Sequence, residues 1–144
     1  HTRSSAASDV YKRQLIHFVG DIHQPMHIGR YEDRGGNRVN VKWFGRNTNL
    51  HRLWDSDMIN SYGMSYSEFA KNLPVPEKLE IKFEREDLID WVNDIHSHTR
   101  DIYRGVSNDD RLGYEYQYKN FPIVRELILK GGMRLAAILN YLFD

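Results

Sequence analysis

The stretch His17–His27, which reads HFVGDIHQPMH, is the most informative part of the sequence because it places three histidines and one aspartate within eleven residues. Side chains four residues apart share a face of an α-helix, so His17 and Asp21 would present an imidazole and a carboxylate together. Pro25 cannot continue a helix and disfavours helical geometry at the preceding residue. The helix is therefore predicted to end near Gln24, with His27 on the exit turn.

A second pair with the same spacing, His51 and Asp55, follows in the segment LHRLWD. The two pairs and His27 make a metal site the leading hypothesis. The chain has no cysteine, so a metal would have to use His, Asp or Glu. Catalytic zinc takes three such ligands and keeps one position for water. The alternative is two ordinary surface pairs on helices, each worth about 0.2–0.5 kcal/mol.

The length of the chain indicates one domain, and its composition is ordinary for a protein with a hydrophobic core. The chain has 144 residues, and its 20 basic side chains balance 20 acidic ones. With a net charge of zero, the chain lacks the overall positive charge that would point to nucleic-acid binding. This does not exclude such binding, because a metal site can supply positive charge locally. No apolar run approaches the ~20 residues of a membrane span.

The periodicity of apolar residues predicts a mainly α fold with one small β-hairpin. Residues 38–44 alternate as a strand, which would pair with the Gly-rich loop before it, and residues 45–49 read as a turn whose Thr or Asn caps the next helix. Neither an internal repeat nor a second-domain linker is visible. Helices are expected over 10–24, 49–61, 67–73 and 84–104, and from Pro122 near a first turn to Phe143.

Residues 1–14 lack this periodicity in their first eight positions, which are small and polar after His1. We expect a leader, tag or sequence junction there, with a native tail as the alternative.

Three segments in order resemble the core of the zinc-dependent single-strand nucleases of the S-one/P-one type, a family similar in fold to bacterial zinc phospholipase C. They are His17–His27, Asp33–Asn37 (DRGGN) and Asn49–Asp55 (NLHRLWD). Gly132–Asn140 looks like the last helix of that family. The resemblance covers residues 15–144, as the C-terminal part of a single zinc nuclease domain with its N-terminal half missing.

The resemblance implies a site of three Zn²⁺ ions. His17 and Asp21 match ligands of two paired zincs, and Asp21 is the bridging carboxylate at the catalytic centre. His27, His51 and Asp55 match the complete protein ligand set of the third zinc.

The resemblance also implies substrate contacts. Gly35 and Asn37 match the loop that contacts the nucleotide base, although Asn37 could equally be a turn residue. His23 matches no ligand and is expected to pack or to support the ligands. Four aromatic residues can stack on bases but are more often core or hairpin residues: Tyr31, Trp43, Phe44 and Tyr62.

Members of this family are about twice as long, and their N-terminal half supplies the remaining ligands. The chain is therefore expected to hold about one zinc by itself, to hydrolyse little, and to expose apolar surface where the other half would pack.

The resemblance therefore implies a zinc-dependent phosphodiesterase, secreted or periplasmic and monomeric, that cleaves single-stranded DNA, RNA or 3′-nucleotides to 5′-phosphate products. A zinc phospholipase C-like enzyme is one rival, and the loop Gly35–Asn37 and the short carboxylate of Asp55 favour the nuclease over it. A non-catalytic zinc-binding helical module is the other.

Overall fold

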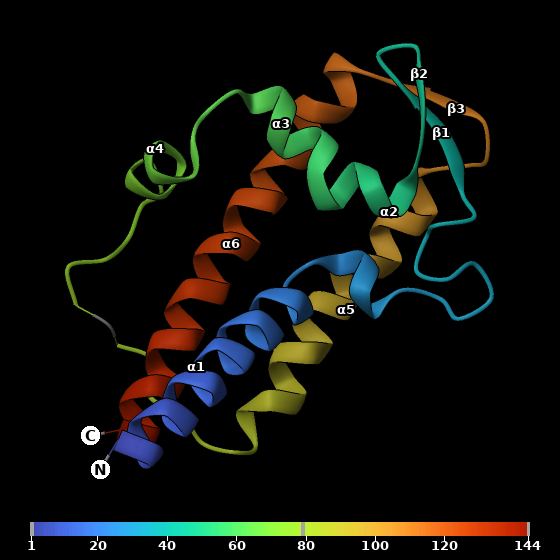
Figure 1. The fold of residues 1–144 in the computed structure, drawn as a ribbon. Coiled ribbons are helices and arrows are strands. Elements are labelled where there is room, and N and C mark those ends of the chain that lie inside the picture. Colours follow the sequence, from blue (N-terminus) through green and yellow to red (C-terminus); the bar gives the residue numbers. More distant parts are fainter. Residues whose placement is uncertain (1, 79, 144) are drawn as a thin grey trace.

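Three long helices form the body of the molecule in the computed structural model, which describes residues 2–78 and 80–143, with side chains from residue 6 onward. They are α1 (Thr2–Ile22), α5 (Asp87–Gly105) and α6 (Tyr114–Phe143). Figure 1 shows α1 lying along α6, with a small sheet at the far end of the molecule. The two helices are antiparallel, because Lys12 lies over the Phe143 ring near one end and His23 bonds Arg134 further along.

The N-terminal helix is longer than its apolar periodicity predicts. It begins at Thr2 rather than near Val10. Once one end of a helix is held by packing, here by Val19 against α5 and α6, each further residue adds a hydrogen bond without a new nucleation cost.

Pro25 ends the regular helix, as predicted. The chain continues as a short 3-10 helix, η1 (Pro25–Ile28), which is capped by Gln24: its side-chain oxygen accepts from the Met26 backbone N–H. Thr99 of α5 donates to the Pro25 carbonyl oxygen at 2.8 Å. This contact fixes the segment that carries His27 onto the long helix behind it.

The β element is a three-stranded sheet rather than the single hairpin expected. The strands are β1 (Asn40–Trp43), β2 (Arg46–Asn49) and β3 (Asp110–Leu112), in the order β2-β1-β3. β1 pairs antiparallel with β2, not with the loop before it, through a two-residue turn in which Phe44 and Gly45 both have positive φ. β3, which follows α5 in the chain, pairs in parallel with β1. The two strands are far apart in the sequence, so the local alternation of apolar residues cannot reveal this pairing.

The second ligand pair lies on the predicted helix over 49–61, which is divided into α2 (Leu50–Arg52), a π-helical segment η2 (Leu53–Asp57) and α3 (Met58–Tyr62). Asn49 caps it by accepting from the Arg52 backbone N–H at 2.8 Å, as predicted. Asp55 falls inside the π-helical turn, a feature that is frequent at functional sites. The short helix α4 (Tyr66–Lys71) follows.

The last helix begins at Tyr114, eight residues before the predicted start at Pro122, which lies in the helix interior. Packing explains the difference. Tyr116 accepts a hydrogen bond from the Trp54 indole at 3.0 Å, and buried Phe121 packs against Tyr62 and Phe69. These contacts outweigh the missing proline N–H.

The main core joins η1, the sheet, the helical run from Leu50 and the helices α4 to α6; a smaller core joins α1, α5 and α6. The most deeply buried side chains among the described residues are Val19, Met26, Val41, Trp43, Leu50, Leu53, Met58, Ile95 and Leu127. Within the described residues, no helix combines the length and the apolar character needed to cross a membrane.

Candidate metal centre

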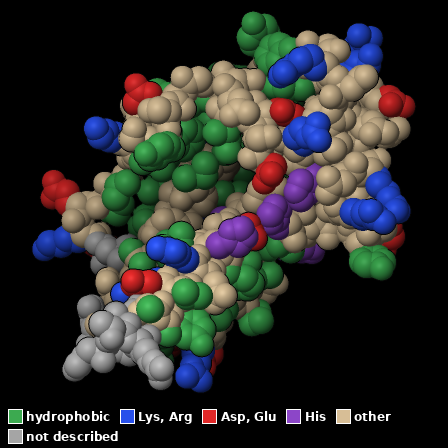
Figure 2. Space-filling view, viewed as in Figure 1, with side chains coloured by type: hydrophobic (Ala, Val, Ile, Leu, Met, Phe, Trp, Pro, Cys, Tyr) green, Lys and Arg blue, Asp and Glu red, His purple; other side chains and the backbone are tan. Residues whose placement is uncertain are grey.

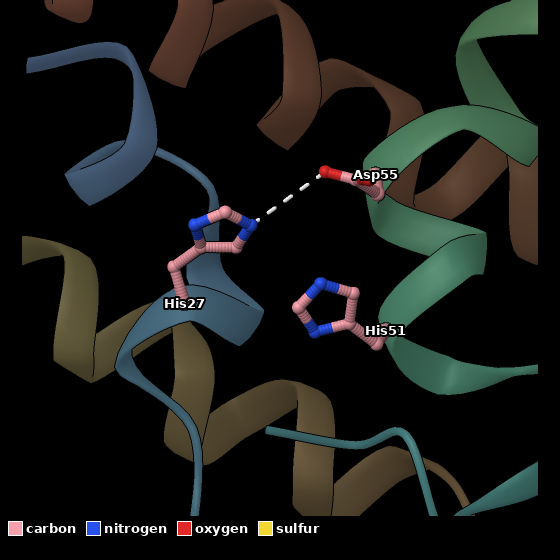
Figure 3. A group of neighbouring side chains, drawn as sticks. All are labelled: His27, His51 and Asp55. Atoms are coloured by element: carbon pink, nitrogen blue, oxygen red, sulfur yellow. Dashed lines mark ion pairs between the residues drawn. The ribbon is translucent and has the colours of Figure 1, made fainter. Parts of the chain in front are cut away.

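Three predicted ligands meet where η1 faces the start of the second helical run. Ligand atoms of His27, His51 and Asp55 all lie within 4.8 Å of one another. Figure 3 shows the two imidazoles and the carboxylate turned toward a common space, with His27 contributed by η1 and the other two by α2 and η2. His27 Nε2 is 3.7 Å from Asp55 Oδ1, and the two imidazole rings stack with centroids 5.1 Å apart.

The geometry of this group suits a zinc ion. Ligands about 2.0–2.2 Å from a tetrahedral zinc lie roughly 3.3–3.6 Å from one another. The 3.7 Å between His27 Nε2 and Asp55 Oδ1 is close to this range, and all three ligand atoms lie within 4.8 Å of one another. Two nitrogens and one oxygen are a normal donor set for such a site, and they leave the fourth position for water or substrate.

The orientation of His51 is fixed from behind. Its Nδ1 lies 2.9 Å from the carbonyl oxygen of Gly35, which can only accept, so Nδ1 carries the proton and Nε2 keeps its lone pair for a metal. A hydrogen bond of this kind sets the tautomer of metal-binding histidines and raises their affinity. Gln24 is a second supporting residue, which the sequence did not reveal: its Nε2 lies 3.4 Å from Asp55 Oδ1.

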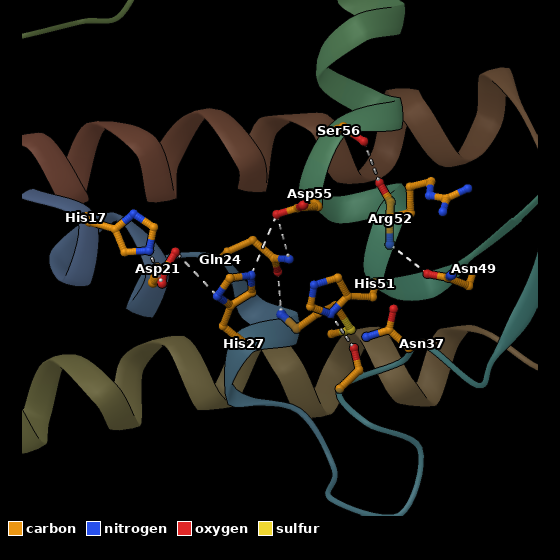
Figure 4. A network of polar contacts seen from close by, with 12 residues as sticks. His17, Asp21, Gln24, His27, Asn37, Asn49, His51, Arg52, Asp55 and Ser56 are labelled. Atoms are coloured by element: carbon orange, nitrogen blue, oxygen red, sulfur yellow. Dashed lines mark hydrogen bonds and ion pairs between the residues drawn. The ribbon is translucent and has the colours of Figure 1, made fainter.

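The other predicted pair is joined to this group through Asp21. One oxygen of its carboxylate lies 3.0 Å from His17 Nε2 and the other 3.6 Å from His27 Nδ1. Figure 4 shows His17, Asp21, His27 and Asp55 as one line of polar side chains. Among the described residues, the only three donor side chains that gather closely enough for a metal are His27, His51 and Asp55. His17 has a 78% exposed side chain and lies at the open end of the line.

The Gly-rich loop lies directly beneath His51. Arg34, Gly35 and Gly36 have successive φ values of 55°, 65° and 82°, in the left-handed region that favours glycine. Asp33 closes the loop, because its Oδ1 accepts from the Gly36 N–H at 2.7 Å and from the Tyr103 hydroxyl at 2.8 Å. Burial, with Asp33 alongside, raises the pKa of Tyr103 to about 12, so the hydroxyl remains a donor.

Asn37 plays a structural part in this loop. Its Nδ2 donates to the Arg34 carbonyl oxygen at 2.8 Å, while the side chain stays exposed. The residues that adopt positive φ are its three predecessors, not Asn37 itself. Figure 4 shows the Asn37 side chain near His51.

Gly35→Ala is expected to destabilise the protein by about 2–4 kcal/mol, because the new Cβ adds a clash with the Met26 carbonyl oxygen to the cost of positive φ. Gly45→Ala is the matched control: its φ is 82° but nothing lies within 4 Å of the new Cβ, so we expect a loss of about 1–2 kcal/mol. Urea unfolding measures both. Equal losses of unfolding free energy in the two variants would show that the clash with the Met26 carbonyl oxygen contributes nothing.

His23 is buried and lies outside the group of three metal donors. Its Nδ1 donates to the Val19 carbonyl oxygen at 2.7 Å, and its Nε2 accepts from Arg134 at 3.0 Å. Burial lowers the pKa of His23, which keeps the ring neutral. Arg134 also donates to Asp94 at 2.8 Å. Burial alone would raise the pKa of Asp94, but the bonds from Arg134 and Lys130 outweigh it and lower that pKa. This network joins α1, α5 and α6.

Arg134→Leu is expected to lower the free energy of unfolding by about 3 kcal/mol, because it leaves His23 Nε2 and the Asp94 carboxylate without their buried partner. Arg111→Leu, at an exposed position, should change stability by less than about 0.5 kcal/mol. Urea unfolding of both variants checks this. A loss no larger for Arg134→Leu than for the control would contradict it.

Apolar surface lies open beside the ligands, as expected. A groove of about 380 Å³ runs between α1, η2 and α6 and reaches Asp21, His27 and Asp55. Figure 2 shows the histidines as a diagonal row with acidic side chains among them and hydrophobic side chains on both sides. The groove's apolar lining comes from Ile16, Val19, Pro25, Trp54, Ile59, Val124, Leu127, Ile128 and Leu135.

Known proteins match this chain along nearly all of its length. The family model described as S1/P1 Nuclease matches residues 1–144. Endonuclease 4 of Arabidopsis thaliana is 36% identical over 90% of this chain and 49% of its own length. Nuclease S1 of Aspergillus oryzae is 32% identical over 88% of this chain and 52% of its own length. The chain thus spans about half the length of the curated relatives it matches, and it belongs to the S1/P1 nuclease family.

Proposed function

We propose that this chain carries part of the active site of a zinc-dependent phosphodiesterase that cleaves single-stranded DNA or RNA, or 3′-nucleotides, and leaves 5′-phosphates. The observation that carries the proposal is the convergence of His27, His51 and Asp55, with His51 held in the metal-binding tautomer by the Gly35 carbonyl oxygen. Relatives named as endonucleases and nucleases support the reaction class.

Zinc bound at such a site would lower the pKa of a bound water and offset negative charge on a phosphodiester. In our proposal His27, His51 and Asp55 hold one ion, and His17 and Asp21 contribute to a paired-metal site completed by residues outside this chain. Asp21 contacts His17 and His27, and it would link the single-metal site to the paired-metal site. Gly35 and Asn37 would contact the base, with the side-chain oxygen of the exposed residue Asn37 as an acceptor.

The proposal also covers the localisation and the oligomeric state of the whole enzyme. By the resemblance to its family, we expect a protein that is secreted or periplasmic and acts as a monomer.

The test has two stages. Elemental analysis of the dialysed chain should give about one zinc, and the chain alone should cleave single-stranded DNA only weakly. Adding a polypeptide homologous to the other half of the relatives should then raise cleavage of single-stranded DNA well above that of duplex DNA. Strong cleavage by the isolated chain would contradict the division of the site proposed here.

The rivals give different results in the same assays. A phospholipase C-like enzyme would hydrolyse phosphatidylcholine in preference to single-stranded DNA. A non-catalytic zinc module would bind zinc and gain thermal stability, yet cleave neither substrate after the other half is added.

A further inference from the structure

A second hollow, separate from the apolar groove, opens on the other side of His27 and His51. It encloses about 600 Å³, and its wall includes these two histidines together with Arg30, Arg34 and Arg38. The three arginines belong to one segment, Arg30–Arg38, which we call the arginine loop. The hollow therefore brings a set of cations to the edge of the candidate metal centre.

The cations of the arginine loop are available to an anion. All three side chains are exposed, and among the described residues none of them forms an ion pair with a carboxylate. Arg38 donates to the backbone carbonyl oxygen of Glu32 at 3.0 Å, and the Arg30 guanidinium lies 4.3 Å from the Tyr103 ring centroid. Planar guanidinium groups bind phosphate oxygens through two parallel hydrogen bonds.

Negative charge in the loop does not cancel these cations. Glu32 is its one exposed carboxylate, whereas the carboxylate of Asp33 is half-buried and accepts from Tyr103 and Gly36. The loop thus carries three guanidinium groups against two carboxylates, a formal excess of one positive charge on a chain whose formal net charge is zero.

Tyr31 adds an aromatic face to the same hollow. Its side chain is 94% exposed. The other aromatic candidates are occupied elsewhere: Trp43 is buried, Phe44 packs between Trp43 and Tyr114, and Tyr62 packs on Phe69 and Phe121. An exposed tyrosine among arginines is the combination by which proteins bind single strands, because bases stack on the ring and phosphates contact the cations.

The backbone holds this arrangement in place before any ligand binds. The Gly35 N–H donates to the Arg30 carbonyl oxygen at 2.8 Å, and the Arg38 N–H donates to the Asp33 carbonyl oxygen at 3.0 Å. Together with the Tyr103 bond to Asp33, these contacts fix both ends of the loop. A rigid surface loses less conformational entropy on binding.

We propose that the arginine loop binds the single-stranded polynucleotide outside the bond that is cleaved, with Arg34 and Arg38 on phosphates and Tyr31 stacked on an unpaired base. The inference rests on the proposed function for its substrate class. It extends that function by predicting that longer single strands bind better than mononucleotides, with little preference for base.

The test is binding of a labelled oligothymidylate of about twelve nucleotides to the chain in EDTA, so that neither metal binding nor cleavage enters the measurement. Affinity is followed as a function of salt concentration. Arg34→Gln with Arg38→Gln should weaken binding about tenfold at low salt and reduce the slope of log K against log salt by about 1.4, since each phosphate contact on a single strand contributes roughly 0.7.

Tyr31→Ala should weaken binding to the single strand about tenfold with little change of slope, and should leave duplex binding unchanged. The matched control is Arg46→Gln with Arg111→Gln, which removes the same charge from exposed positions on the sheet and should leave affinity within about twofold of the original chain.

Equal weakening by the control pair, or an equal effect of Tyr31→Ala on duplex, would overturn the assignment of the strand to this loop. Normal binding by the loop variants would overturn it too, even if the completed enzyme cleaves DNA, so the proposed function can survive the failure of this inference. Conversely, loop-dependent binding by a chain that takes up no zinc would uphold the loop and contradict the proposed metal chemistry.

Discussion

Replacing His51 with alanine is expected to abolish zinc uptake by this chain. Only His27 and Asp55 would then remain in the one group of three donors present among the described residues, and two ligands are too few for a stable zinc site. The substitution also leaves the Gly35 carbonyl oxygen without its partner. Because loss of an outer hydrogen bond alone costs about 10–100-fold in metal affinity, we expect a larger loss for the ligand itself.

Two measurements check this expectation. Elemental analysis of the dialysed protein should fall from about one zinc to none. Zinc at 100 times its Kd should stabilise the original chain by about 2.7 kcal/mol and the variant not at all. His96→Ala removes an exposed histidine from α5 and should change neither result. Undiminished zinc in His51→Ala would mean that the metal binds elsewhere.

Asp21→Asn is expected to separate metal binding from catalysis. If Asp21 bridges two metals, as proposed above, the amide cannot supply the charge of that carboxylate, so cleavage of single-stranded DNA by the completed enzyme should fall by more than about 100-fold. The zinc content of this chain alone should hardly change, because Asp21 lies beside His27 rather than within its group with His51 and Asp55.

The control for this variant lies on the same helix. Asp9→Asn removes an equal charge from an exposed position of α1 and should leave both cleavage and zinc content unchanged. Loss of zinc from the isolated chain with Asp21→Asn would show that Asp21 belongs to the first metal site rather than to a second one.

The ligand pairs were predictable because their geometry is local. Helical spacing alone puts His17 beside Asp21, and Pro25 alone ends the helix before His27. The helical class, the cap at Asn49 and the short helix near Phe69 follow from patterns of the same kind.

The secondary structure predicted from the sequence was wrong where contacts between distant segments outweighed the local patterns. The strand β2 consists of residues typical of turns and forms because β1 lies opposite it. The last helix continues through Pro122 because Tyr116 and Phe121 are held by Trp54, Tyr62 and Phe69. No sequence window contains both partners of these contacts.

The sequence by itself determined the donor types, their helical spacing, the Gly-rich loop and, through three ordered segments, the family. Tertiary structure alone decided that His27 meets His51 and Asp55, that Gly35 fixes the tautomer of His51, and that Arg134 links His23 to Asp94. It also decided that three arginines and Tyr31 share one hollow beside the metal centre. The physical reason is that spacing along a chain fixes directions within one helix, whereas contacts between elements depend on how complete side chains pack.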